Sequence, residues 1–85
     1  MPVRVLLVED ETDIVAPLVR ALEREGYAVE HAATGGEALA ASERQTYDVV
    51  VLDVGLPDID GLEVCRRLRA ADFAGAVLIL SARTR

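Results

Sequence analysis

Acidic residues follow two apolar runs of the 85-residue sequence, at the points where these runs end. Glu9 and Asp10 come directly after residues 3–8, and Asp53 comes directly after residues 49–52. If the two runs are neighbouring strands, the three carboxylates converge, and their repulsion raises their pKa values unless a cation holds them. Mg²⁺ is the natural cation, because it takes carboxylate oxygens, keeps several waters and bridges to phosphate. The sequence therefore predicts a magnesium site at these strand ends.

Of these three acidic residues, Asp53 has the position that most strongly indicates a functional role. A carboxylate that directly follows four buried apolar residues is costly without a partner. Asp10 taken alone would be interpreted as a helix cap or a solvated loop charge. Ser81, after the apolar residues 76–80, would be interpreted as a turn residue. These positions indicate a site only when they are taken together.

Four segments predict strands that would position these residues. Residues 3–8, 49–52 and 76–80 are near-continuous apolar runs, as expected for strands covered on both faces of a parallel sheet. Residues 28–31 form a weaker and more mixed run, which we place at the edge of the sheet.

Helical patterns separate the predicted strands. The apolar positions that mark the three helices are Ile14, Leu18, Ala21 and Leu22, then Ala38 and Leu39, then Leu62, Cys65 and Leu68, with Val64 alongside, after Gly61. Gly26 is a stop signal after the first helix, and Thr34 with Glu37 forms a capping-box pattern that opens the second. This alternation predicts an α/β fold with an open, doubly wound parallel sheet. In such sheets the working site lies at the carboxyl ends of the strands.

Composition excludes several classes of site. The net charge is −6 and all nine basic residues are arginines, so the chain is not expected to bind nucleic acid by itself. The absence of lysine excludes a P-loop or a Schiff-base lysine. One cysteine, Cys65, and one histidine, His31, offer no zinc site. No apolar run approaches the roughly 20 residues that span a bilayer, and no signal peptide is evident, so we expect a cytoplasmic protein without membrane contact.

Three motifs carry a resemblance to a known family. They are Val8-Glu9-Asp10, Asp53-x-x-x-Pro57-x-x-x-Gly61 and Leu80-Ser81-Ala82. Together, and in this order, they resemble the acidic pair, the phosphoacceptor loop and the switch hydroxyl of CheY-like response regulator receiver domains. The likeness covers residues 1–85 and is closest to receivers attached to winged-helix DNA-binding domains. It implies a flavodoxin-like fold with strand order 2-1-3-4.

The resemblance also implies roles for individual residues. Asp53 would take a phosphoryl group from a sensor histidine kinase. Asp10, Asp53 and the backbone carbonyl of Gly55 would ligate Mg²⁺, and Glu9 would hold the metal through water. Ser81 would donate a hydrogen bond to the bound phosphoryl group. The implied function is two-component signal transduction that controls transcription through a DNA-binding domain absent from this chain.

Two other functions are compatible with parts of the pattern. The chain could be a receiver-like binding module that pairs with a kinase or receiver without switching. A turnover enzyme is not expected, although a phosphatase of the haloacid-dehalogenase type also places a nucleophilic Asp after a strand. Such phosphatases carry a second Asp two residues later, where this sequence has Gly55, and they need a lysine.

The sequence departs from the family pattern in its last part. A receiver normally continues through another helix, a fifth strand and a final helix, and the lysine that pairs with the phosphoryl group follows that fifth strand. This chain ends at Arg85, after the predicted fourth strand, so we expect an incomplete receiver domain over residues 1–85. The apolar fourth strand would then be an uncovered sheet edge, which predicts a marginal monomer that self-associates through this edge.

Overall fold

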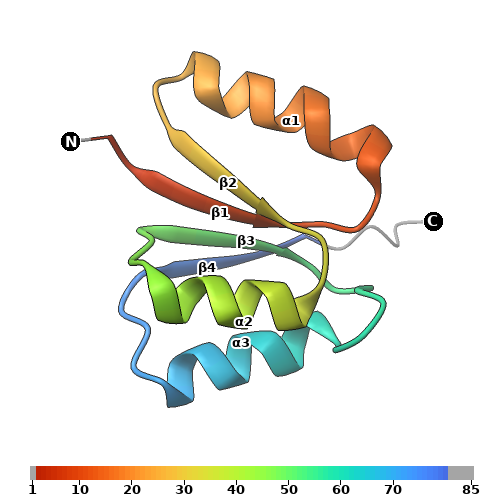
Figure 1. Cartoon of the computed structure of the whole chain (residues 1–85), viewed down its shortest axis with the longest axis vertical. Coiled ribbons are helices and arrows are strands. Elements are labelled where there is room, and N and C mark those ends of the chain that lie inside the picture. The colour runs from red at the N-terminus through yellow and green to blue at the C-terminus, as the bar shows by residue number, and fades with distance from the viewer. Residues whose placement is uncertain (1, 81–85) are drawn as a thin grey trace.

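The chain folds as alternating strands and helices, and the computed structural model describes residues 2–80 (Figure 1). The elements are β1 (Arg4–Val8), α1 (Thr12–Arg24), β2 (Ala28–Ala32), α2 (Gly35–Arg44), β3 (Val49–Asp53), α3 (Gly61–Ala70) and β4 (Ala76–Leu80). This order confirms the predicted α/β class. The strand boundaries differ from the predicted runs by one residue at three ends, and Asp53 is the last residue of β3 rather than the first loop residue.

All four strands are parallel and pair in the order β2-β1-β3-β4, which confirms the predicted strand order and the edge position of β2. In the pairing of β1 with β3, Val8 lies opposite Leu52. The residues that follow these two strands therefore leave the sheet side by side at its carboxyl edge.

Helices cover both faces of the sheet, with α1 on one face and α2 and α3 on the other (Figure 1). The main core lies between the sheet and the α2–α3 layer, and its largest fully buried members are Leu6, Val8, Val50, Leu52, Val64 and Leu68. Because side chains alternate along a strand, Val5 and Leu7 point to the α1 face, and they are also buried. Within Thr12–Arg24 no side chain is fully buried, so the α1 face is the less completely covered one.

Local signals explain where the helices begin and end. The Glu37 N–H donates to the Thr34 hydroxyl oxygen over 3.1 Å, which confirms the predicted cap of α2. The Glu37 carboxylate accepts from the N–H of Ala33 at 2.9 Å, one residue before the cap. Gly26 follows α1 with a φ of 95°, a conformation in which glycine has no steric penalty.

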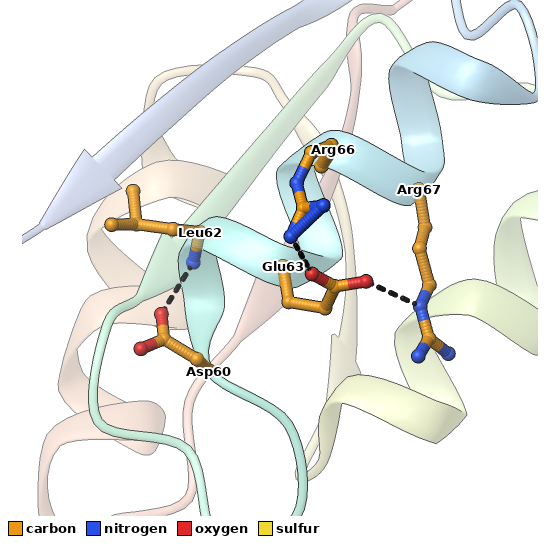
Figure 2. A network of polar contacts seen from close by, with 5 residues as sticks. All are labelled: Asp60, Leu62, Glu63, Arg66 and Arg67. Carbon is orange, nitrogen blue, oxygen red and sulfur yellow. Dashed lines mark hydrogen bonds and ion pairs between the residues drawn. The ribbon is translucent and has the colours of Figure 1, made fainter.

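The surface of α3 carries a small polar network (Figure 2). The Asp60 carboxylate caps the helix by accepting from the Leu62 N–H at 2.8 Å. One turn further, the Glu63 carboxylate forms ion pairs with Arg66 and Arg67. In residues 2–80 these are the only ion pairs between side chains, and both are on the solvent side of the helix.

Of the apolar positions that mark α3 in the sequence, only Leu62 does not pack against the core. Leu62 is 58% exposed, whereas Gly61, Val64 and Leu68 are buried and Cys65 lies partly buried beside them. The reason is that Gly61 packs directly against the backbone of β3, which turns positions 61, 64 and 68 toward the sheet and Leu62 away from it.

β4 is an apolar edge strand in the described part of the chain. Val77 packs against the core, but Leu78 and Leu80 are 54% and 44% exposed, and Ile79 is exposed as well. This agrees with the expected apolar sheet edge. None of the helices within residues 2–80 is long and apolar enough to cross a membrane.

Gly61 provides a test of this packing. A Cβ atom at this position would lie 2.5 Å from the carbonyl oxygen of Asp53 and 2.9 Å from the Cα of Val54, both backbone atoms that cannot move aside. Alanine normally stabilises a helix relative to glycine, but we expect Gly61→Ala to destabilise the chain by about 1–3 kcal/mol through overpacking. Urea denaturation measures this, with the exposed neighbour change Leu62→Ala as control. A Gly61→Ala chain as stable as the wild type would contradict the packing described here.

Candidate metal centre

Three carboxylates meet at the carboxyl edge of the sheet. Glu9 and Asp10 follow β1, and Asp53 ends β3, the strand beside it. Each of the three side chains offers an oxygen atom, and these atoms all lie within 4.8 Å of one another. The predicted convergence of Glu9, Asp10 and Asp53 is therefore confirmed.

Two of these carboxylates are buried. Glu9 is 6% exposed and Asp53 is 7% exposed, and they are the only buried charged residues in residues 2–80, whereas Asp10 is open to solvent. Burial raises the pKa of the Glu9 carboxyl, and repulsion by Asp53 and Asp10 acts in the same direction. A hydrogen bond from the Glu11 N–H, 3.1 Å long, partly opposes this increase. The cluster therefore concentrates negative charge. Within residues 2–80, no arginine forms an ion pair with any of these three carboxylates.

The backbone around Glu9 is held by β2. The Glu9 N–H donates to the carbonyl of Ala32 over 3.0 Å. The Glu9 carbonyl lies 2.8 Å from Nε2 of His31, and because a carbonyl can only accept, this nitrogen carries a proton. This contact of His31 with the backbone of the site follows from the pairing of β2 with β1, which the sequence around His31 does not indicate by itself.

The loop of residues 54–60 leads from Asp53 to α3. It is closed at its base by a hydrogen bond from the Gly61 N–H to the carbonyl of Val54, 3.0 Å long. Gly55 lies in this loop and is exposed to solvent, and the use of its carbonyl as a ligand stays a prediction. Ser81 lies outside the described residues, so its role as a phosphoryl hydrogen-bond donor also stays a prediction.

Asp58 is a residue of this loop that the sequence did not indicate. Its carboxylate accepts hydrogen bonds from the N–H groups of Gly35 and Gly36, at 2.8 and 2.9 Å. These bonds lower the pKa of Asp58, the Gly36 bond most of all. No local pattern marks such a contact, because its partners lie 22 and 23 residues away in the chain.

The donor set fits a hard divalent cation. Clustered carboxylate oxygens without nitrogen or sulfur ligands suit Mg²⁺, and a bound cation would oppose both the burial and the carboxylate repulsion that raise the pKa of Glu9. Glu9, Asp10 and Asp53 could hold such an ion.

The raised pKa of Glu9 gives a pH test. Its pKa in the folded chain lies above the usual 4.5, so its contribution to stability is present below pH 4.5 and is lost as the pH rises through the folded value. In metal-free buffer we expect Glu9→Gln to match the wild type below pH 4.5 and to be the more stable chain at neutral pH. Saturating Mg²⁺ should stabilise the wild type more than the variant.

Chemical denaturation at several pH values, with and without Mg²⁺, measures these differences. The pKa of Asp58 is also shifted, below its usual 3.8. Because both chains contain Asp58, its titration changes their stabilities equally and does not affect the difference between them. Parallel stability curves for the two chains across the whole range would show that Glu9 is not held in a strained, buried site.

Comparisons with known proteins agree with this geometry. Residues 5–85 match the family model described as response regulator receiver domain. The transcriptional regulatory protein TcrA of Mycobacterium tuberculosis is 53% identical over 81 residues, which are 95% of this chain and 32% of TcrA. The transcriptional regulatory protein CreB of Escherichia coli is 50% identical over 80 residues, which are 94% of this chain and 35% of CreB. The chain therefore spans about a third of the length of these regulators.

Solved structures share the fold. The chemotaxis response regulator CheY4 of Vibrio cholerae superposes with a TM-score of 0.93 and 32% identity, over 100% of this chain and 72% of that one. The response regulator TrrA of Thermotoga maritima, solved in complex with Mg(2+)-BeF, gives a TM-score of 0.90 and 36% identity, over 96% of this chain and 71% of that one.

Proposed function

The chain belongs to the response regulator receiver family, and on this premise we propose that Asp53 accepts a phosphoryl group in a Mg²⁺-dependent reaction. The observation that carries the proposal is the convergence of Glu9, Asp10 and Asp53 within 4.8 Å. Asp53 is the member that lies within its strand, where it pairs with Leu80 of β4, whereas Glu9 and Asp10 follow the end of β1.

In the proposed reaction, a carboxylate oxygen of Asp53 attacks the phosphorus of a phosphohistidine. The new O–P bond forms as the P–N bond breaks, and the imidazole leaves with the electron pair. Bound Mg²⁺ supplies charge neutralisation for the transferring phosphoryl oxygens. Asp10, Asp53 and the Gly55 carbonyl would ligate the metal, and Glu9 would hold it through water. The Ser81 hydroxyl would donate a hydrogen bond to the bound phosphoryl group.

The donor in this proposal is a sensor histidine kinase, and the regulated process is transcription. Support comes from the family and from the regulators that the chain resembles. Output would require a DNA-binding part, because the acidic charge of −6 does not favour contact between this chain and nucleic acid. Each chain accepts one phosphoryl group, so the reaction is stoichiometric and the chain is not a turnover enzyme.

A second candidate function is a receiver-like module that binds a kinase or a receiver without switching. The observation in its favour is that the sequence contains no lysine to pair with a phosphoryl group on Asp53. The two functions share the fold and differ in whether Asp53 is modified.

Phosphorylation by a small donor separates them. We expect the 85-residue chain, incubated with acetyl phosphate or phosphoramidate and Mg²⁺, to gain the mass of one phosphoryl group. Asp53→Asn should abolish the gain, and removal of Mg²⁺ by a chelator should reduce it by at least about tenfold. Asp72→Asn, a change of an exposed aspartate in the loop before β4, is the control and should leave it unchanged. No gain in any of these chains would favour the binding module.

We also propose that the chain pairs with a second copy of itself through β4. This strand has no charged residue, and within residues 2–80 its outer edge has no partner strand, so an extended segment of a second copy can pair with its backbone groups. The side chain of Arg69 reaches from α3 to the residues just before β4, where it donates to the carbonyls of Phe73 and Gly75, and Asp53 of the acidic cluster lies opposite Leu80 at the end of β4. Antiparallel pairing of the two β4 strands would place opposite charges together, whereas parallel pairing would place the acidic clusters together.

Sedimentation velocity over a concentration series tests this pairing. The wild type should show a dimer that forms with rising concentration, and Leu78→Lys should shift it to monomer. Leu62→Lys places the same charge on an equally exposed leucine of α3 and should not affect the dimer. A wild type that is monomeric at every concentration and melts cooperatively would overturn the pairing.

A further inference from the structure

The loop that follows Asp53 is joined by hydrogen bonds to the start of α2. Asp58 accepts the first two N–H groups of α2, those of Gly35 and Gly36, at 2.8 and 2.9 Å. These groups have no acceptor within their own helix, and the positive end of the helix dipole favours a carboxylate there. The next two N–H groups of α2 are satisfied from the other side, by the hydroxyl and the carbonyl of Thr34.

The contact depends on two glycines. A Cβ atom on Gly35 would lie 2.8 Å from Cγ2 of Val64 and 3.1 Å from Cβ of Ile59, so only glycine lets the start of α2 approach α3 and the loop this closely. A Cβ atom on Gly36 would lie 3.3 Å from Oδ2 of Asp58. The glycine pair thus gives the carboxylate access to the backbone and gives Ile59 a packed position beside it.

The Gly55 carbonyl, which is the proposed metal ligand, lies between the base of the loop and the hydrogen bonds that tie Asp58 to α2. At the base, the Gly61 N–H holds the Val54 carbonyl at 3.0 Å, and the lack of a side chain on Gly61 lets it lie against the backbone of Asp53. Gly55 comes next after Val54, and Asp58 is three residues further along. Gly55 is exposed and has no side chain to anchor it, so the position of its carbonyl depends on what holds its neighbours: the bond at Val54, the packing of Leu56 against the core, and the hydrogen bonds of Asp58 to α2.

We propose that Asp58 is a positioning residue of the phosphoacceptor loop, which it ties to the start of α2 so that the Gly55 carbonyl is held in place for the metal. The inference rests on the proposed function of the site. The carboxylate stays ionised at neutral pH, because the two glycine N–H groups lower its pKa, so the tie persists under the conditions in which phosphorylation would occur. Metal binding and the tie should therefore stabilise one another.

A purely structural role is the competing explanation, in which Asp58 only caps α2. Thr34 is the matched control for that role, because it caps the same helix end and does not belong to the loop. Asp58→Ala and Thr34→Ala each remove acceptors from the N-terminus of α2, and only the first frees the loop. Asp58→Asn keeps one acceptor oxygen and is the conservative variant.

The experiment measures Mg²⁺ binding by calorimetry on the 85-residue chain, and phosphorylation by acetyl phosphate as a function of Mg²⁺ concentration. We expect Asp58→Ala to raise the apparent Kd for Mg²⁺ about tenfold, as loss of an outer support of a metal ligand does. Its phosphorylation rate at saturating Mg²⁺ should change by less than about threefold, because Asp53 itself is intact. Asp58→Asn should fall between Asp58→Ala and the wild type, and Thr34→Ala should stay within about twofold of the wild type.

The outcomes separate this inference from the proposed function. If the wild type neither binds Mg²⁺ nor takes a phosphoryl group, the proposed function fails. If the wild type does both and Asp58→Ala differs no more than Thr34→Ala, the site stands and the positioning role is overturned. If Asp58→Ala does not fold, as shown by its circular dichroism, the decision passes to Asp58→Asn, whose Kd must still exceed that of Thr34→Ala.

Discussion

The parallel pairing of β1 with β3 is the interaction on which the site depends. Val8 lies opposite Leu52, and the chain therefore delivers Glu9 and Asp53 to the same point at the carboxyl edge of the sheet. A slip of one residue would turn the buried side chains of either strand to the opposite face, so the core sets the register. The carboxylates meet because the apolar residues before them can pack in only one way.

The same packing sustains an unfavourable concentration of charge. Leu6, Val8, Val50 and Leu52 are fully buried, and burial of each such side chain contributes roughly 1.5–3 kcal/mol. The strand ends that carry Glu9 and Asp53 follow these residues directly, so the repulsion between the carboxylates is opposed by the core rather than relieved by movement of the backbone. Burial, and after it the repulsion by Asp53 and Asp10, raises the pKa of Glu9. A site held in this way is prepared for a cation before the cation arrives.

Sequence patterns were sufficient for the parts of the fold that depend on neighbours in the chain. The apolar runs, the cap at Thr34 and the stop at Gly26 mark elements that the structure contains, and the resemblance to receivers supplied the strand order. The convergence of the carboxylates followed from placing the first and third strands together. The exposed face of Leu62 was not foreseen, because helical spacing alone does not say which face Gly61 turns toward the sheet.

Contacts between segments that are distant in the chain could not be predicted from the sequence. The tie from Asp58 to Gly35 and Gly36 joins a loop to a helix, and it exists only once the sheet has brought α2 and α3 side by side. The contact of His31 with the backbone of Glu9 likewise follows from the pairing of β2 with β1. The first contact holds the loop that follows Asp53 and the second holds the backbone of Glu9, so these supports are less evident in the sequence than the carboxylates themselves.

The identity of the modified residue tests the central claim most directly. After incubation with acetyl phosphate and Mg²⁺, borohydride reduction converts an aspartyl phosphate to homoserine, and peptide mass spectrometry locates it. The account predicts homoserine at position 53 and at no other carboxylate of the chain. Homoserine at Asp10 or at a surface aspartate, with Asp53 unmodified, would contradict it.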